Sequence, residues 1–167
     1  MPRRVFYSFD YESDAWRASM IRNIGIIKSS QPASDNTWET MKRGGDSAIR
    51  RWIDEQLHGR SCTIVLIGSN TAHRRWVKYE IEESWERGKG LLGICIHKLL
   101  DQNQEEADPG PNPFDAILLP DGKPLSFRVH TYEPPGATSK EVYTHISKNL
   151  ADWIEMAIAA RKTANTR

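Results

Sequence analysis

The sequence has few cysteines, no long apolar run and almost no net charge. Its 167 residues include 23 Lys and Arg against 22 Asp and Glu, which gives a formal charge of +1. This balance argues against a general nucleic-acid-binding protein, because such proteins carry an excess of basic residues. No segment approaches the roughly 20 apolar residues that a membrane-spanning helix needs, and the first residues lack the apolar core of a signal peptide. We therefore expect a cytoplasmic protein that binds neither nucleic acid nor membrane.

The residues that bind metals are also scarce and scattered. The two cysteines, Cys62 and Cys95, each lie inside an apolar run without a second Cys or a His at ligand spacing. A buried Cys behaves as a small apolar side chain, so we expect two free thiols in a reducing compartment. The five histidines have no metal-ligand spacing either. No metal site is expected.

What the sequence does contain is an alternation of strand and helix signals. Strands are predicted for short apolar or β-branched runs, at residues 4–9, 24–27, 62–67, 91–96, 117–119 and 125–129. Helices are predicted to begin near residues 13, 46, 71 and 139, where apolar side chains recur at helical spacing. In the first helix, Trp16, Met20 and Ile21 are expected to face the core. The run at 62–67 has the character of a parallel strand that is covered on both faces.

These signals predict the fold class and the domain. Alternating strands and helices favour an α/β protein with three layers, in which a mainly parallel sheet lies between two layers of helices. The length suits one domain, which we place at residues 1–160. Residues 161–167 are expected to form a flexible tail. Because ligands of such folds bind beyond the carboxyl ends of the strands, the loops that follow the strands are where a site is expected.

Several nucleotide sites are excluded by what surrounds their motifs. Residues 88–93, Gly-Lys-Gly-Leu-Leu-Gly, match the dinucleotide fingerprint GxGxxG. That fingerprint needs a strand before it and a helix after it, whereas here a predicted helix precedes and a strand follows, so we interpret Gly88 as a helix end. A phosphorelay receiver would need an Asp after the central strand, where this chain has Ile67 and Gly68. The loop after the first strand lacks the glycine typical of a flavin phosphate site.

The helix predicted over residues 74–87 carries one carboxylate in an unusual place. Its buried stripe is expected to consist of Val77, Ile81 and Trp85. Glu80 lies at the border of this stripe, with Trp76 four residues before it and Ser84 four residues after it. A carboxylate in this position could be partly desolvated and directed into a cleft. A surface ion pair with Arg74 or Arg87 is the alternative.

Five short blocks occur in one order between residues 4 and 115. They read RVFYSF (4–9), TIVLIG (63–68), RRWVKYEI (74–81), GICIH (93–97) and GPNPFD (110–115). With these blocks the chain resembles the TIR-like proteins of the bacterial Thoeris antiphage defence system, the ThsB family. Beyond Asp115 the resemblance is weaker.

The resemblance implies a flavodoxin-like TIR fold and cleavage of NAD at the nicotinamide–ribose bond. It implies that the product is a cyclic ADP-ribose isomer, which activates a separate effector protein. A phage-derived trigger and self-association in the active state are further expectations from the family. NAD is expected as substrate, and no other cofactor. The catalytic residue of the family lies in a Trp-Val-x-Tyr-Glu motif, which identifies Glu80.

The resemblance implies substrate contacts from the end of the first strand and from the loops after the second and fourth strands, which in this sequence are Phe6, Ser8, Phe9 and Asp10, then Trp38, then Asn112. Trp76 is a further aromatic candidate. The aromatic side chains could stack on nicotinamide or adenine, or pack in the core. Asn112, between two prolines, offers a fixed amide or simply shapes a turn. Asp10 departs from the family, because we expect His there in relatives, and an acidic group could repel a phosphate.

The chemistry fits these residue types. Cleavage of the bond to a cationic nicotinamide leaves an oxocarbenium-like ribose, which a carboxylate can stabilise without a metal. Nicotinamide is a good leaving group, so one glutamate suffices. Two other readings stay open: a TIR-like module that only binds a protein partner, and a nucleotide-binding sensor without turnover.

Overall fold

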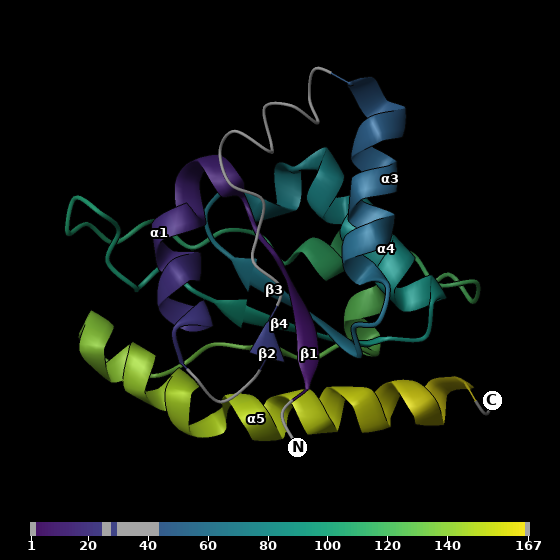
Figure 1. The fold of residues 1–167 in the computed structure, drawn as a ribbon. Helices are drawn as coiled ribbons and strands as arrows, with labels where there is room; N and C mark the ends of the chain where they lie inside the picture. Colours follow the sequence, from purple (N-terminus) through teal and green to yellow (C-terminus); the bar gives the residue numbers. More distant parts are fainter. Residues whose placement is uncertain (1–2, 25–27, 30–43, 166–167) are drawn as a thin grey trace.

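The computed structural model describes residues 3–24, 28–29 and 44–165. Within them, five parallel strands form one sheet in the order β2-β1-β3-β4-β5 (Figure 1). The strands are β1 (Arg4–Ser8), β2 (Lys28–Ser29), β3 (Cys62–Ile67), β4 (Gly90–Cys95) and β5 (Thr131–Tyr132). The α-helices are α1 (Tyr11–Arg22), α3 (Gly45–Leu57), α4 (Arg75–Glu86) and α5 (Ser139–Asn165). Three short 3-10 helices complete the elements: η1 (Thr71–His73), η2 (Pro113–Ala116) and η3 (Leu125–Phe127).

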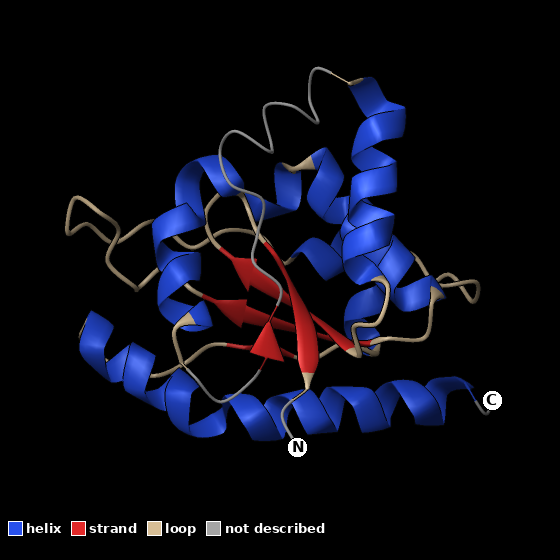
Figure 2. Ribbon diagram, in the orientation of Figure 1, coloured by secondary structure: helices blue, strands red, loops and turns tan. Residues whose placement is uncertain are grey.

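Helices cover both faces of the sheet, so the predicted three-layer α/β class is confirmed (Figure 2). Side chains of β3 alternate between the two layers, as the pleat of a strand requires. Ile64 and Leu66 pack with α1 and α5, whereas Val65 packs with α4. Every residue of β3 is buried, as predicted for a strand covered on both faces. Of the described helices, none combines the length and apolar character that crossing a bilayer requires.

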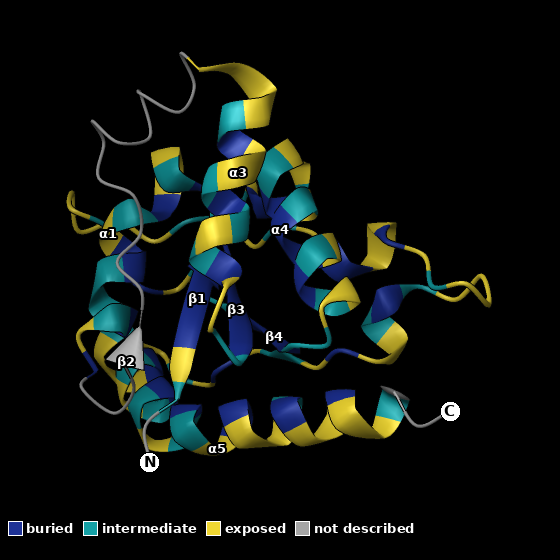
Figure 3. Cartoon of the chain, turned by 45° about the vertical axis from the view of Figure 1, so that its right-hand side comes forward, coloured by how far each residue is buried: buried dark blue, intermediate teal, exposed yellow. Residues whose placement is uncertain are grey.

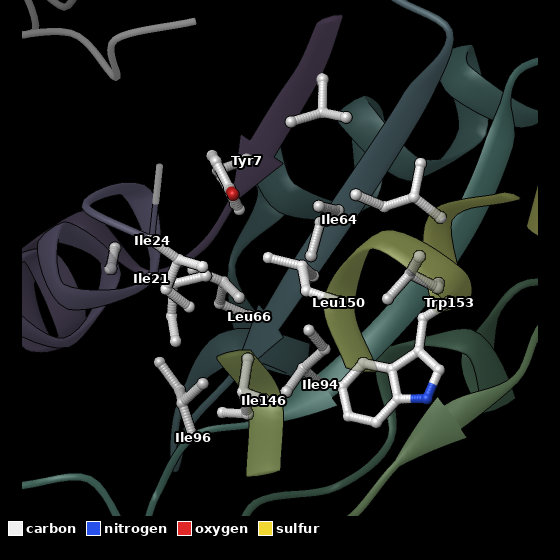
Figure 4. Packing of buried hydrophobic residues seen from close by; sticks show 14 of the residues in the cluster. Tyr7, Ile21, Ile24, Ile64, Leu66, Ile94, Ile96, Ile146, Leu150 and Trp153 are labelled. Carbon is white, nitrogen blue, oxygen red and sulfur yellow. The ribbon is translucent and has the colours of Figure 1, made fainter. Parts of the chain in front are cut away.

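The larger core lies between the sheet and helices α1 and α5 (Figure 4). Ile21 of α1, Ile94 of β4 and Leu150 of α5 meet there, and none of the three has any exposed surface. Burial of each such side chain contributes about 1.5–3 kcal/mol to folding. Helix α5 is buried along one side and exposed along the other (Figure 3). The packing of α1 and α5 holds the strands in place, and the candidate site described below lies at the carboxyl ends of these strands.

The first helix differs from its prediction. It begins at Tyr11, two residues early, and Trp16 is 51% exposed instead of buried. The inward positions are taken by Asp14, Arg17, Ala18 and Ile21, which follow helical spacing. Asp14 and Arg17 are buried as an ion pair of 2.8 Å, a pairing that a hydrophobic pattern does not reveal.

Two predicted strands do not form. Residues 117–125 make a single bridge between Leu118 and Pro124, and η3 follows it. The reason is local, because Pro120 and Pro124 cannot donate to a ladder. The edge strand is instead β5, which pairs with β4. The second predicted strand, at 24–27, lies largely outside the described residues, and β2 pairs with β1 just after it.

Two helix boundaries also move. Arg74 is extended (φ −88°, ψ 118°), so the helix predicted from residue 71 is split into η1 and α4. Gly88 follows α4 with φ 74°, which confirms that this glycine belongs to a helix end. Helix α5 continues through Asn165, so it ends later than the boundary placed at residue 160. Both cysteines are free thiols: Cys62 is buried as predicted, whereas Cys95, at the end of β4, is partly exposed, which corrects the expectation that both are buried.

Candidate active site

A cavity of about 260 Å³ opens at the carboxyl end of β1. Its walls come from two segments that are about 70 residues apart in the sequence. The first is the end of β1 and the start of α1, with Phe6, Tyr7, Phe9, Asp10, Tyr11 and Glu12. The second is the start of α4, with His73, Arg74, Arg75, Trp76, Val77 and Glu80, and Trp52 of α3 completes the wall. The cavity lies where ligands of parallel α/β folds bind.

Glu80 is the carboxylate of α4 that lines this cavity. Only 8% of its surface is exposed, and its Oε1 accepts a hydrogen bond from Ser8 Oγ at 3.3 Å. Burial raises the pKa of Glu80 to about 8, and the bond from Ser8 partly opposes this shift. A carboxyl group that titrates near neutral pH inside a cavity is typical of functional sites. The predicted placement of Glu80 is therefore confirmed, and its role in catalysis stays a prediction.

The alternative of a surface ion pair for Glu80 is wrong. Arg74 binds Asp10 and Glu12 instead, and Arg87 binds Asp54 and Glu83 at the other end of α4. In the described part of the chain Glu80 therefore has no salt bridge, and its carboxyl group is buried without a basic partner.

The backbone of Glu80 is fixed by two buried hydroxyl groups. Ser84 Oγ donates to the carbonyl oxygen of Glu80 at 2.6 Å. Thr63 Oγ1 on β3 lies 2.7 Å from Ser84 Oγ and shares a hydrogen bond with it. Neither hydroxyl residue has exposed surface. The glutamate is therefore held at its side chain by β1 and at its backbone by β3, which limits its freedom to move in the cavity.

Three of the four predicted aromatic residues, Phe6, Phe9 and Trp76, line the cavity. Phe6 also packs in the small core beside α3 and is 4% exposed, so its core role is confirmed and its stacking on a substrate stays a prediction. Phe9 stacks on Tyr11, with ring centroids 5.9 Å apart. The Arg75 guanidinium lies over the Trp76 ring, 4.6 Å from its centroid. The cavity thus has aromatic walls next to a buried carboxyl group.

Asp10 is buried, but its charge is balanced. Its side chain is 2% exposed, and its Oδ1 lies 2.9 Å from Arg74 Nε. Glu12 lies 3.2 Å from Arg74 Nη2. The cavity wall therefore carries an ion-pair network at this point, rather than the isolated negative charge that the sequence suggested. Sequence reasoning named Arg74 only as a partner for Glu80, although it begins the block RRWVKYEI.

Two further predicted residues, Asn112 and Ser8, are not among those that line the cavity. Asn112 caps η2: its Oδ1 accepts from Phe114 N at 2.9 Å, and its Nδ2 donates to Thr131 Oγ1 at 3.1 Å. These bonds match the turn role that was its alternative. Ser8 instead contacts Glu80, which does line the cavity, through the hydrogen bond to its Oε1. Trp38 lies outside the described residues, and within the described ranges no cluster of His, Cys, Asp or Glu could hold a metal.

Ser8→Ala is expected to raise the pKa of Glu80 further, because the hydrogen bond that favours the ionised form is lost while burial stays. The measurement is an NMR titration of the glutamate carboxyl carbons, with the Glu80 signal assigned from Glu80→Gln. Ser13→Ala, an exposed serine in α1, is the control. An unchanged titration midpoint in Ser8→Ala would show that the hydrogen bond does not act on Glu80.

Comparison with known proteins places the chain in one family. The model of the family "Thoeris protein ThsB, TIR-like domain" matches residues 6–101, a range that contains Phe6, Ser8 and Glu80. A protein of Bacillus cereus (strain MSX-D12) named "Putative cyclic ADP-D-ribose synthase ThsB1" is 39% identical over 149 residues. The match covers 84% of this chain and 76% of that protein. The chain belongs to the ThsB family of Thoeris TIR-like proteins.

Proposed function

We propose that the protein cleaves NAD at the nicotinamide–ribose bond and joins the ends of the remaining ADP-ribose into a cyclic isomer. The observation that carries the proposal is the buried Glu80 carboxyl group in an aromatic cavity at the carboxyl edge of the sheet. The name of the Bacillus cereus relative, a cyclic ADP-D-ribose synthase, supports the same reaction. In this proposal NAD is the substrate, and no further cofactor takes part.

The first step breaks the bond between ribose C1′ and the nicotinamide nitrogen. The bonding electron pair leaves with nicotinamide, which becomes neutral, and the positive charge passes to the ribose. The ionised Glu80 carboxylate stabilises that charge in the transition state, where a preorganised charge in a dry site has its largest effect. Although burial favours the protonated acid at rest, the cationic nicotinamide favours the ionised form when it binds.

The second step closes the ring. A nucleophilic atom of the same ADP-ribose attacks C1′ in place of water, and a hydroxyl group that does so transfers its proton to the Glu80 carboxylate. The apolar walls at Phe6 and Trp76 favour this outcome, because they restrict access of water to the cation. Their rings also offer stacking surfaces for nicotinamide or adenine. Contacts from Trp38 and Asn112 remain part of the proposal without support from the cavity.

The wider function follows the family. We propose that the chain acts as one TIR-like domain that includes α5 through Asn165, that the cyclic nucleotide diffuses to a separate effector protein, and that a phage-derived component triggers the enzyme. Self-association in the active state belongs to the same proposal. A binding module without chemistry is the second candidate, favoured by the balanced Asp10–Arg74 pair, which could simply stabilise the loop.

The test is mass spectrometry of the small molecules formed when the purified protein is incubated with NAD, with and without lysate of phage-infected cells. We expect nicotinamide together with a product that has the mass of NAD minus nicotinamide. Product at the mass of linear ADP-ribose would support cleavage without cyclisation. Saturable NAD binding without product would favour the sensor, and the absence of both would favour the protein-binding module.

A further inference from the structure

Arg74 lies at the rim of the cavity and is held there by two carboxylates. Its Nε lies 2.9 Å from Asp10 Oδ1, and its Nη2 lies 3.2 Å from Glu12 Oε2. Asp10 is itself buried, with 2% of its side chain exposed, so it cannot turn away into solvent. The two carboxylates therefore bind the guanidinium through Nε and Nη2 and fix its plane.

One nitrogen of the same guanidinium is available. Nη2 donates to Asp10 Oδ2 at 3.4 Å as well as to Glu12 Oε2, and Nε lies against Asp10 Oδ1, whereas within residues 3–24, 28–29 and 44–165 no group accepts a hydrogen bond from Nη1. The side chain is 40% exposed and lines the cavity that also contains Glu80. A guanidinium held in place with a free Nη1 group can donate charge-assisted hydrogen bonds to phosphate oxygens.

The neighbouring arginine is less suited to this task. Arg75 Nη2 binds Asp46 Oδ2 at 2.6 Å on the surface, and its guanidinium is stacked over the Trp76 ring. Its side chain is 61% exposed, so a bond from it to an anion would be made close to water. Without a basic residue at the rim, Asp10, Glu12 and Glu80 would repel an anionic substrate.

We propose that Arg74 binds a phosphate group of the dinucleotide and that Asp10 and Glu12 are positioning residues for its guanidinium. The inference rests on the proposed function, since it takes NAD as the ligand. In NAD the phosphate is joined to the ribose that Glu80 would face, so both residues can contact one molecule in one cavity. Asp10 then has a role that favours phosphate binding, although its own charge is negative.

The test measures binding by calorimetry in a Glu80→Gln background, so that turnover does not consume the ligand. NAD is compared with nicotinamide riboside, which has no phosphate. Arg74→Gln is expected to weaken NAD binding about ten- to a hundredfold, the range for hydrogen bonds to a charged group. Binding of nicotinamide riboside should change less than about twofold, because the lost contact is made only to phosphate. Arg74→Lys, which keeps the positive charge but lacks the guanidinium, should recover part of the NAD affinity.

Arg87→Gln is the matched control. Arg87 follows α4 directly as its C-cap, just as Arg74 precedes it, and it is also paired with two carboxylates, Asp54 and Glu83, and does not line the cavity. We expect it to leave both affinities unchanged. If Arg74→Gln weakens the binding of both ligands equally, or of neither ligand, the assignment of Arg74 is overturned. The proposed reaction would not be affected by that result. If the Glu80→Gln protein does not bind NAD and the wild-type protein releases no nicotinamide, both proposals fail.

Discussion

Glu80→Gln is expected to lower the rate of nicotinamide release from NAD by about a hundred- to a thousandfold, the range for losing one preorganised charge-stabilising group. Glutamine has nearly the same shape as glutamate and can still accept a hydrogen bond from Ser8 Oγ, so the cavity should keep its form. What is lost is the negative charge that stabilises the ribose cation. The loss should appear in kcat more than in KM, because the charge acts mainly in the transition state.

The measurement is a chromatographic assay of nicotinamide, made under conditions in which the wild-type protein is active. Glu82→Gln is the control, since Glu82 lies on the same helix but is exposed and does not line the cavity. It should be as active as the wild-type protein. An active Glu80→Gln protein, in the same assay, would contradict the catalytic assignment.

The central part of this fold could be predicted because its physical signals are local. The strand at 62–67 was predicted at its observed bounds, since a parallel strand buried on both faces needs an unbroken apolar run. The border position of Glu80 followed from the helical period of Val77 and Ile81, both of which are buried. These predictions depend only on residues within one element.

Features that depend on partners far apart in the sequence could not be predicted. Asp10 and Arg74 are 64 residues apart, and a charge pattern does not show that one neutralises the other. The buried pair of Asp14 and Arg17 was missed for a related reason: Arg17 also donates to the carbonyl oxygens of Leu99 and Glu105, and only the folded chain brings these acceptors to it. In a sequence, charged residues normally indicate the exposed face of a helix. In α1, however, Asp14 and Arg17 are buried, and Trp16, which was expected in the core, is exposed.

The same substitution of Glu80 is expected to stabilise the protein as the pH rises. The pKa of Glu80 is about 8 in the folded state and 4.5 for an ordinary glutamate. Between these values the folded state holds its proton more tightly than the unfolded state, so the wild-type protein loses free energy of unfolding as the pH increases from about 4.5 to about 8. Above pH 8 the loss is complete. Glutamine has no proton to lose and avoids this cost.

The difference between the two proteins isolates Glu80, because all other groups titrate in both. The gain in free energy of unfolding from Glu80→Gln should be smallest at pH 5 and should increase toward pH 9, by at most about 5 kcal/mol. Urea unfolding of both proteins at pH 5, 7 and 9 measures it. The free energy of unfolding of Glu82→Gln should change with pH in the same way as that of the wild-type protein. The same pH dependence in Glu80→Gln would mean that the Glu80 carboxyl group is not desolvated.

Taken together, the activity and stability of Glu80→Gln separate a catalytic carboxyl group from a structural one. A glutamate that served the fold would cost stability when its charge is removed, as the loss of a buried partner normally does. Among the described residues, no cation forms an ion pair with Glu80 that would offset its burial, and the one hydrogen bond to its side chain comes from the neutral Ser8. A buried charged group that destabilises the fold is retained by selection when the transition state requires its charge. We therefore expect the less active protein to be the more stable one.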